Sequence, residues 1–538
     1  MNTLDYIIIA IYSIGLLGLG YFFKDQKDTK DYFLGGRSFG WFSMGMSTMA
    51  SQLSAISFIS AAAFVGLKPN GGMQWLTYEF AVPLAMIFLI VVIIPPLYNA
   101  GVVSIYSYLE ERFSSTTRVL ISCVFQISRA FATGIMIYVV ALVLAGVMDI
   151  PFEYTVLVSG IVTIIYAYQG GMKAVVWGDV IQMIILLLGL IICTVYGLIQ
   201  VGGLSGLSAN VDVTRTNVLD FNWGIGEGQE FGFWPMIIGG FFLYASYYGC
   251  DQSQAQRSLS GKSLKEVQRA LLFNGLFRFP VVICYCFMGL VIGTFAMTEA
   301  GSGLMTEILN ISQASFAEVD GLQPGEIKPD LLIPVFIMQY LPHGIIGLLL
   351  VAILAAAMSS LSSAINSLSA ATVEDLINRN RKTPLTTERH LRISKMMTVV
   401  WGLFCMILAF SAGNIADTVI EAINKVGSAF YGPIVATFIL AILSKRVTAV
   451  GMNIGLLVGV GVNVYIWLSG APIFWMWWNF IGAAVTLSIA YLSSALIGNR
   501  NVNALLTIPK LNFFRTESYI LLGYFFFMVF VSWCLSMG

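Results

Sequence analysis

Long runs of apolar residues are the feature that most constrains how this chain folds. They recur along the 538 residues, and most reach the roughly 20 residues that a helix needs to cross the hydrocarbon core. Backbone polar groups inside a bilayer must be paired within the structure, which favours helices over open strands. The composition agrees, because 58% of the residues are hydrophobic and only 10% are charged. The sequence therefore predicts an all-α polytopic membrane protein with about 14 transmembrane helices.

The distribution of basic residues predicts how the chain crosses the membrane. Lys and Arg are in excess in cytoplasmic loops, and an outward-facing N-terminus places nearly all of them inside. The outer loops then hold only Lys68, Arg215 and Lys328. The first span has no basic n-region and no cleavage site, so we expect it to be retained. We expect a multi-pass protein of the cell inner membrane with both termini outside.

Six ionisable residues fall inside the predicted spans: Glu79, Arg129, Asp179, Arg278, Glu421 and Lys425. A charge at bilayer depth costs at least about 2.5 kcal/mol, so each should face a partner or a cavity rather than lipid. Glu421 and Lys425 are spaced to pair on one helix face. Arg129 and Arg278 have no such local partner. For both, a structural ion pair and a role in substrate binding or gating remain open.

Polar residues interrupt two of the apolar runs. The segment STMASQLSAISFIS, residues 47–60, breaks the second span with Ser54, Ser57 and other polar side chains. A span five helices later, residues 233–251, turns polar at its inner end with Tyr244, Tyr247 and Asp251. Helices broken at mid-membrane expose carbonyl oxygens that bind ions and substrates, and matching breaks in two halves predict an inverted repeat.

A third polar region is rich in hydroxyl groups. The segment AAAMSSLSSAINS, residues 355–367, contains Ala356, Ser359 and Ser360. Small residues at this density usually allow close helix packing. Carbonyl and hydroxyl oxygens, together with the Asp179 carboxylate, are also the ligands that a hard cation such as sodium needs.

Several function classes are disfavoured. The two histidines, His343 and His390, do not suit a histidine-based metal or triad site. The chain has no Walker sequence, and nothing indicates nucleic-acid binding. Its seven cysteines fall within or at the edges of spans and imply no disulfide framework. We expect a transporter, not an enzyme, with a membrane sensor or channel as the alternative of another class.

Six motifs resemble the sodium:solute symporter family, which includes sodium/glucose, sodium/iodide and sialic acid transporters. They are DYFLGGRS at 31–38, SQLSAISF at 51–58, YLEERF at 108–113, GGMKAVVWGDVIQ at 170–182, DQSQAQR at 251–257 and AAAMSSLSSAINS at 355–367. The resemblance implies two inverted five-helix repeats in a leucine-transporter-like fold, working by alternating access. The implied division is 1–40 for a leading helix and loop, 41–201 for the first repeat, 202–232 for an external loop, 233–443 for the second repeat, and 444–538 for three C-terminal helices.

The resemblance also implies site residues. The family's principal sodium site matches the carbonyls of Ala50, Leu53 and Ala356 and the hydroxyls of Ser359 and Ser360, and Asp179 matches an acidic position tied to sodium. Gly178 departs from the Thr of many relatives. No other cofactor is implied. The expected partners are sodium, a small-molecule solute and the lipid bilayer, with no requirement for an oligomer.

The substrate is less constrained by the resemblance. Polar positions that touch sugar in some members match Ser57, Glu79, Tyr244 and Arg278, with Tyr247 as an inner gate, and only Glu79 and Tyr247 keep the family residue. In sialic acid transporters, positions matching Ser54, Ser57, Glu79 and Arg129 line the site. Arg129 can bind a carboxylate through two parallel hydrogen bonds, whereas Glu79 would repel an anion. The sequence favours a carboxylate such as sialic acid, with a sodium/sugar symporter as the alternative.

Overall fold

The computed structural model describes residues 1–23, 29–53, 56–148, 151–317, 321–379, 386–412, 415, 418–497 and 511–537. Within these residues the structure is helical, with two isolated backbone bridges, Phe39 with Gly261 and Ile225 with Ile473. The helices of the first half are α1 (Thr3–Phe22), α2 (Thr29–Leu34), α3 (Trp41–Gln52), α4 (Ala62–Gly66), α5 (Ala81–Phe88), α6 (Ile94–Ala100), α7 (Tyr106–Arg112), α8 (Ser115–Met148), α9 (Phe152–Val201) and α10 (Gly203–Asn210). The helices of the second half are α11 (Phe233–Cys250), α12 (Gln252–Leu259), α13 (Leu264–Ala296), α14 (Ser302–Ser315), α16 (Leu332–Tyr340), α17 (Ile345–Ala371), α18 (Thr387–Ala409), α19 (Val419–Leu443), α20 (Ala449–Leu468), α21 (Trp477–Ile497) and α22 (Thr516–Met537).

Short segments of 3₁₀ or π helix join some of these helices. They are η1 (Gly35–Arg37), η2 (Ser57–Ala61), η3 (Met73–Phe80), η4 (Leu89–Ile93), η5 (Val213–Thr216), η6 (Glu299–Gly301), η7 (Pro329–Leu331) and η8 (Thr372–Ile377). The segment η3–α5–η4–α6 makes one continuous apolar span, Met73–Ala100.

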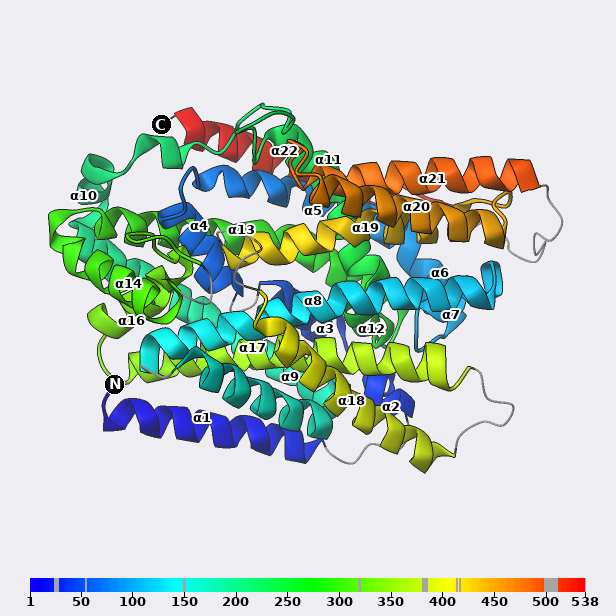
Figure 1. Ribbon diagram of the computed structural model, residues 1–538, viewed down its shortest axis with the longest axis horizontal. Helices are drawn as coiled ribbons and strands as arrows, with labels where there is room; N and C mark the ends of the chain where they lie inside the picture. Colours follow the sequence, from blue (N-terminus) through cyan, green and yellow to red (C-terminus); the bar gives the residue numbers. More distant parts are fainter. Residues whose placement is uncertain are drawn as a thin grey trace.

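Nine helices of the described residues are long and apolar enough to cross a membrane, or ten if α3 and the helix that starts at Ser57 form one bent span. Shorter apolar helices lie at Thr3–Tyr12, Phe152–Ile165 and Ile345–Leu354. The chain is thus an all-α, multi-pass membrane protein, and the count of about 14 spans stays a prediction. Both chain ends lie at the same end of the long axis (Figure 1).

Local sequence explains where several helices start and stop. Asn2 and Asp5 form a capping box at the start of α1, and Ser263 and Thr448 cap α13 and α20 by accepting backbone hydrogen bonds. Such caps satisfy donors that have no partner within the helix. At the end of α9, Gly202 has φ +89°, a left-handed conformation that glycine adopts without strain.

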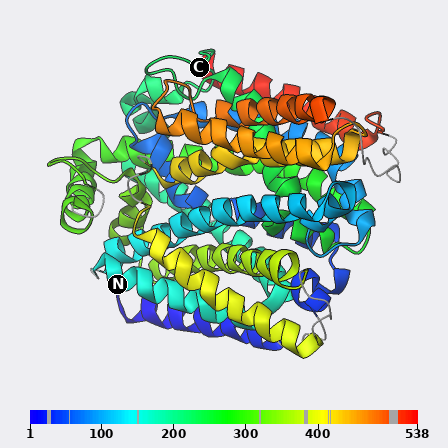
Figure 2. The same ribbon diagram turned by 45° about the vertical axis from the view of Figure 1, so that its right-hand side comes forward.

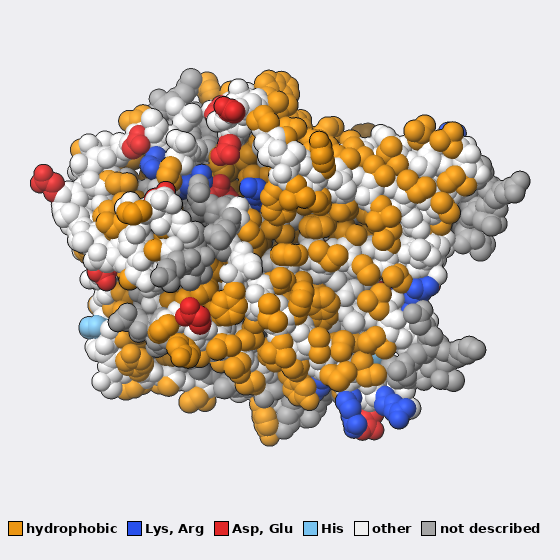
Figure 3. All heavy atoms as spheres, in the orientation of Figure 1, with side chains coloured by type: hydrophobic (Ala, Val, Ile, Leu, Met, Phe, Trp, Pro, Cys, Tyr) orange, Lys and Arg blue, Asp and Glu red, His pale blue; other side chains and the backbone are white. Residues whose placement is uncertain are grey.

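The helices divide into an inner and an outer set. In the spans Ser115–Ala145 and Val419–Leu443, 83% of the most apolar window is buried, against 22% in Thr516–Ser536 and 28% in Trp477–Ile497. α8 and α19 therefore belong to the core, and α21 and α22 have large surfaces for lipid. α1 lies along one side of the bundle and α20 to α22 along the opposite side, with α14 standing off at the end that holds the termini (Figures 1 and 2). Apolar side chains cover the middle of the face in Figure 3, and most of its acidic groups lie toward that same end.

Glycines bring α4 and α13 into backbone contact. A Cβ atom on Gly293 would lie 2.4 Å from the Cα atom of Gly66, and one on Gly289 would lie 2.3 Å from the carbonyl oxygen of Ala62. Small residues permit this close approach of membrane helices. The contact fixes α4, the helical half that follows the break at 47–60, against α13, which also carries Arg278.

Candidate functional site

Two helices are interrupted where the sequence predicts. α3 ends at Gln52, Leu53 leaves the helical conformation, and the next helical segment starts at a 57° angle to it. α11 ends at Cys250, and Asp251 adopts an extended conformation before α12 begins. The predicted polar breaks in the two halves are therefore confirmed, although Ser54 lies outside the described residues.

A central cavity lies beside these breaks. It encloses about 70 Å³ of space for the centres of water-sized groups. Its lining includes Leu53, Ser57, Glu79, Arg129, Tyr247 and Arg278, together with Trp75, Tyr78, Asn424 and Tyr431. The structure thus brings together five of the predicted substrate residues, Ser57, Glu79, Arg129, Tyr247 and Arg278, from η2, η3, α8, α11 and α13. Tyr244, also predicted, lies directly behind Glu79 and Arg278.

Glu79 and Arg278 form a buried ion pair at this cavity. Arg278 donates from Nε to Oε2 of Glu79 at 2.5 Å and from Nη2 to Oε1 at 3.0 Å. The Tyr244 hydroxyl donates to Glu79 at 3.0 Å and accepts from Arg278 at 2.9 Å, and Tyr248 accepts from Arg278 at 3.1 Å. Arg278 therefore offsets the charge of Glu79, and the expectation that Glu79 repels an anion stays a prediction.

Arg129 also has a carboxylate partner. It donates from Nη2 to Oδ2 of Asp251, and both side chains are 4% exposed. The Arg129 guanidinium carbon lies 5.5 Å from the centre of the Tyr247 ring, a cation–π geometry. Its Nε is buried and has no hydrogen-bond partner among the described residues. Arg129 therefore lines the cavity and retains one buried donor that has no hydrogen-bond partner among the described residues.

Two of the predicted sodium ligands, Ala50 and Leu53, lie at the break in α3. Ala50 and Leu53 occupy the last turn and the cap of α3, where carbonyl groups lack partners within the helix. Ser360 is buried on α17, whereas the side chains of Ala356 and Ser359, on the same helix, lie outside the described residues. Oxygen donors of this type suit a hard cation. In the described ranges no cluster of three His, Cys, Asp or Glu residues is arranged to hold a metal.

Asp179 lies in a separate, fully buried polar cluster. Its Oδ2 accepts from Ser47 at 2.5 Å and from Nη2 of Arg257 at 3.1 Å. Arg257 also donates to Ser47, to the Ser253 carbonyl and to Ser363, at 2.7 to 3.0 Å. Asp179 thus already has a cation at hydrogen-bond distance. The charge distribution of the sequence predicts that Arg257 lies in a cytoplasmic loop, and the loop is wrong, because Arg257 is 1% exposed on the helix α12.

The expected pairing of Glu421 with Lys425 is also wrong. Glu421 lies 3.6 Å from Nζ of Lys68, and both side chains are buried. The Thr418 hydroxyl donates to Glu421 at 2.6 Å. Lys425 lines a different pocket, at the C-terminal end of α20 and the N-terminal end of α21. Lys68, which the sequence places in an outer loop, is therefore a buried partner of a core helix.

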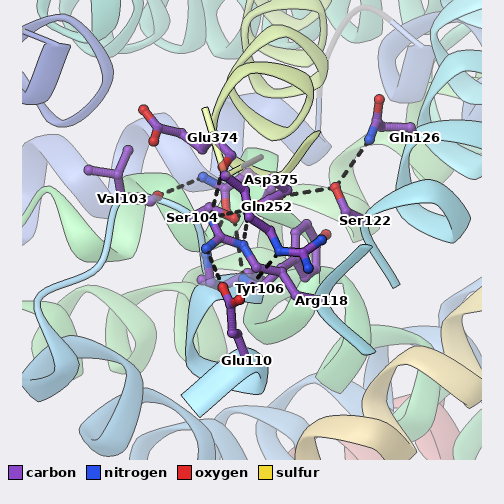
Figure 4. Close-up of polar contacts among 12 residues, drawn as sticks. Val103, Ser104, Tyr106, Glu110, Arg118, Ser122, Gln126, Gln252, Glu374 and Asp375 are labelled. Carbon is purple, nitrogen blue, oxygen red and sulfur yellow. Dashed lines mark hydrogen bonds and ion pairs between the residues drawn. The ribbon is translucent and has the colours of Figure 1, made fainter. Parts of the chain in front are cut away.

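A polar cluster lies toward the end of the bundle opposite the termini (Figure 1), and we call it the Asp375 network (Figure 4). It consists of Ser104, Glu110, Arg118, Ser122 and Asp375. Asp375 of η8 accepts from Ser104, Ser122 and Arg118 at 2.7 to 3.0 Å, and Arg118 also donates to Glu110. Gln252, at the start of α12, bonds the adjoining segment through the carbonyl of Val103 and the N–H of Ile105.

Sequence reasoning missed the partners of the predicted charges. Asp251, Arg257, Tyr248 and Asn424 all belong to the site or its supports. Asp251 and Arg257 both lie in the polar segment DQSQAQR, which has no apolar periodicity to mark it as buried. The available signal was the number of intramembrane arginines without a local counter-ion, since each such charge requires a partner from elsewhere in the chain.

Comparison with known proteins identifies relatives of this chain. The sequence model of the sodium:solute symporter family matches residues 32–459. The chain is 29% identical to the human sodium/iodide cotransporter over 482 residues, covering 87% of this chain and 70% of the relative. It is 29% identical to human sodium-coupled monocarboxylate transporter 1 over 479 residues, covering 87% and 74%. A Na⁺-coupled sialic acid symporter, solved substrate-bound and outward-open, shares the fold with a TM-score of 0.79 and 23% identity, over 93% of this chain and 99% of that one.

Proposed function

This chain belongs to the sodium:solute symporter family, and from that premise we propose that it couples sodium entry to the uptake of a small carboxylate. The observation that carries the proposal is Arg129, a buried guanidinium at the central cavity with an unpartnered Nε donor. A guanidinium fork matches a carboxylate in geometry and charge. The similarity to a monocarboxylate transporter supports the same substrate class.

The size of the cavity favours a small anion. Its volume of about 70 Å³ is several times the roughly 10–15 Å³ that a cavity needs to hold one water molecule. A short monocarboxylate fits this space, whereas sialic acid requires the cavity to widen. We therefore place short monocarboxylates ahead of sialic acid within the carboxylate class.

The hydrogen bonding of Glu79 argues against a neutral sugar. Both of its carboxylate oxygens accept from Arg278, and Oε1 also accepts from Tyr244. A sugar hydroxyl would have to displace part of a buried ion pair, and breaking such a pair costs about 3–5 kcal/mol. The hydrogen bonding at Glu79 therefore makes the sodium/sugar alternative less favourable than it was from the sequence alone.

Charge balance explains why sodium accompanies the substrate. Arg129 with Asp251 and Arg278 with Glu79 are neutral pairs, so an anion bound alone adds one uncompensated charge in a buried site. A sodium ion held by Ala50, Leu53, Ala356, Ser359 and Ser360 offsets that charge, and Leu53 itself lines the cavity. Linkage then requires sodium and the carboxylate to tighten one another's binding by the same factor. One sodium ion gains about 2.3 kcal/mol per 100 mV of membrane potential.

Alternating access follows from the two broken helices. We assign residues 41–201 and 233–443 to the two repeats, with the cavity between the breaks that each contains. The Asp375 network lies at the end that we place in the cytoplasm, and the termini then face outward from the cell inner membrane. In this conformation the polar contacts of that network close the inner side.

The test is uptake into proteoliposomes of labelled pyruvate, sialic acid, galactose, iodide and proline, with and without an inward sodium gradient. We expect saturable, sodium-dependent uptake of pyruvate, and its abolition in Arg129→Ala. Arg392→Ala serves as the matched control, because Arg392 is exposed on α18, and it should transport normally.

Each other outcome points to a different activity. Sodium-dependent uptake of galactose alone would establish the sugar alternative, and uptake of iodide alone would make the substrate an inorganic anion. Flux without saturation or sodium dependence would indicate a channel. No uptake of any compound would refute the carboxylate proposal, and full pyruvate uptake by Arg129→Ala would refute the assignment of Arg129 as the group that binds the carboxylate.

A further inference from the structure

Asp251 occupies the position at Arg129 that a carboxylate substrate needs. Arg129 lines the central cavity, whereas Asp251 lies behind it at the α11–α12 break. Both side chains are buried and form an ion pair. The group bound to Arg129 in this state is thus a carboxylate, the same chemical group that the proposed substrate carries.

The two carboxylate oxygens of Asp251 accept hydrogen bonds from different partners. Oδ1 accepts from the backbone N–H of Ser253 at 2.8 Å and from its hydroxyl at 2.6 Å, which caps α12. Oδ2 accepts from Arg129. The Arg129 contact can therefore be lost while the cap at the start of α12 stays intact.

We infer that Asp251 is a resident counter-ion, that a substrate carboxylate displaces it from Arg129, and that the displaced Asp251 charge drives opening of the end closed by the Asp375 network. This inference rests on the proposed function. The exchange conserves the pairing of Arg129, because one carboxylate replaces another. It leaves Asp251 as an unpaired, buried anion, which is unfavourable until water or another cation reaches it.

The cost at Asp251 is relieved by hydration of the α11–α12 break. The next residue, Gln252, makes two side-chain hydrogen bonds to the segment that contains Ser104. Its Nε2 donates to the Val103 carbonyl at 2.8 Å, and its Oε1 accepts from the Ile105 N–H at 3.0 Å. Ser104 in turn donates to Asp375 at 2.9 Å. Water entering at Asp251 must loosen this segment, and with it the Asp375 network (Figure 4).

The same helix reaches the Asp179 cluster. Arg257, on the last turn of α12, contacts Asp179 and also Ser363 of α17. α12 is thus held at its start by Arg129 and near its end by Asp179. A substrate that frees the start of α12 changes the restraint on a helix that also contacts α17, where three of the proposed sodium ligands lie. This gives the substrate a physical route to the sodium site.

The test is Asp251→Asn, measured by equilibrium binding of labelled pyruvate to the purified full chain in sodium and by uptake in proteoliposomes. Asn caps helices as well as Asp does, so the start of α12 is kept while the competing charge is removed. Apparent affinity scales with the fraction of molecules in which Arg129 is free to bind substrate. If Asp251 occupies Arg129 in roughly nine of ten molecules of the natural protein, the affinity of Asp251→Asn for pyruvate should be about 10-fold higher. Sodium-driven net uptake should fall by at least the same factor, because the drive for opening is gone.

Asp212→Asn is the matched control. Asp212 caps the short turn η5 by the same pattern, accepting from the N–H and hydroxyl of Thr214, but lies exposed in an external connection. It should leave binding and uptake unchanged. Unchanged or weaker pyruvate binding in Asp251→Asn, or tighter binding with undiminished uptake, would overturn the inference.

The design separates this inference from the proposed function. Sodium-dependent pyruvate uptake by the natural protein, combined with no gain of affinity in Asp251→Asn, refutes counter-ion exchange and leaves the function standing. If iodide is taken up and pyruvate is not, the same variant tested with iodide should bind that anion more tightly. If Asp251→Asn is unstable when purified, saturating pyruvate must restore its unfolding midpoint, and failure to do so also refutes the exchange.

Discussion

Glu79 of η3 and Arg278 of α13 lie 199 positions apart in the chain and meet through two parallel hydrogen bonds at the centre of the bundle. Neither charge has access to solvent, so each depends on the other. Removal of one partner leaves a buried charge without a counter-ion and lowers the free energy of unfolding by about 3–5 kcal/mol, whereas removal of both can leave it nearly unchanged. We expect Glu79→Gln and Arg278→Met each to lower the unfolding midpoint of the purified protein, and the double variant to recover most of the loss. Additive losses in the double variant would show that the two charges do not act as a pair.

Loss of one hydroxyl ligand should weaken sodium binding more than substrate choice. Ser360→Ala removes an oxygen from the proposed sodium site, and a neutral ligand of this kind contributes about 1 kcal/mol, equivalent to roughly fivefold in affinity. We expect the sodium concentration for half-maximal uptake to rise about fivefold, with the order of preferred solutes unchanged. Ser367→Ala is the control on the same helix, since Ser367 donates to the Ala364 carbonyl. Equal sodium curves for the two variants would remove Ser360 from the site.

Arg257→Lys should not behave as a conservative change. The guanidinium bonds Ser47, Ser253, Ser363 and Asp179 together, and a single ammonium cannot reach these directions at once. Hydrogen bonds of charged groups contribute about 1.5–3 kcal/mol each, so the free energy of unfolding should fall by at least about 2 kcal/mol. The comparison is Arg392→Lys, at an exposed site on α18, in the same thermal unfolding assay. Indistinguishable midpoints would mean that the buried cluster tolerates a point charge.

The contact of α4 with α13 has no room for an added methyl group, so a Gly→Ala change there should lower the stability of the protein. Gly293→Ala places a Cβ atom 2.4 Å from the Gly66 backbone, and overpacking of this kind costs about 1–3 kcal/mol. Gly303→Ala in α14 adds a Cβ with nothing within 4 Å, and should be neutral or slightly stabilising. Thermal unfolding of both variants checks the prediction. A stable Gly293→Ala variant would show that the two helices can separate without cost.

The sequence was most informative where a pattern is local. The polar interruption at 47–60 and the polar inner end of 233–251 predicted the two broken helices, because a polar run inside an apolar span needs polar partners that an unbroken helix facing lipid does not supply. The resemblance added the cavity residues Ser57, Glu79, Arg129, Tyr247 and Arg278, which the structure brings to one place.

Pairing between distant segments was not predictable in the same way. Spacing identifies partners only three or four residues apart, and here it suggested Glu421 with Lys425 although the tertiary structure supplies Lys68. Arg257 was placed in a loop because hydropathy cannot distinguish a solvated polar segment from a buried polar helix such as α12. Asp251 lies in the same segment and was missed as the partner of Arg129 for the same reason.

The separation of Glu79 from Arg278 has a consequence for biosynthesis. A ribosome adding about 5–20 residues per second needs roughly 10–40 s to travel from one to the other. During that interval the span that carries Glu79 has been made and its counter-ion has not. The nascent span must therefore be sheltered from lipid, by the insertion machinery or by neighbouring nascent helices, until α13 emerges. The order of synthesis, and not only the final fold, thus determines when the charge of Glu79 at the central cavity is first neutralised.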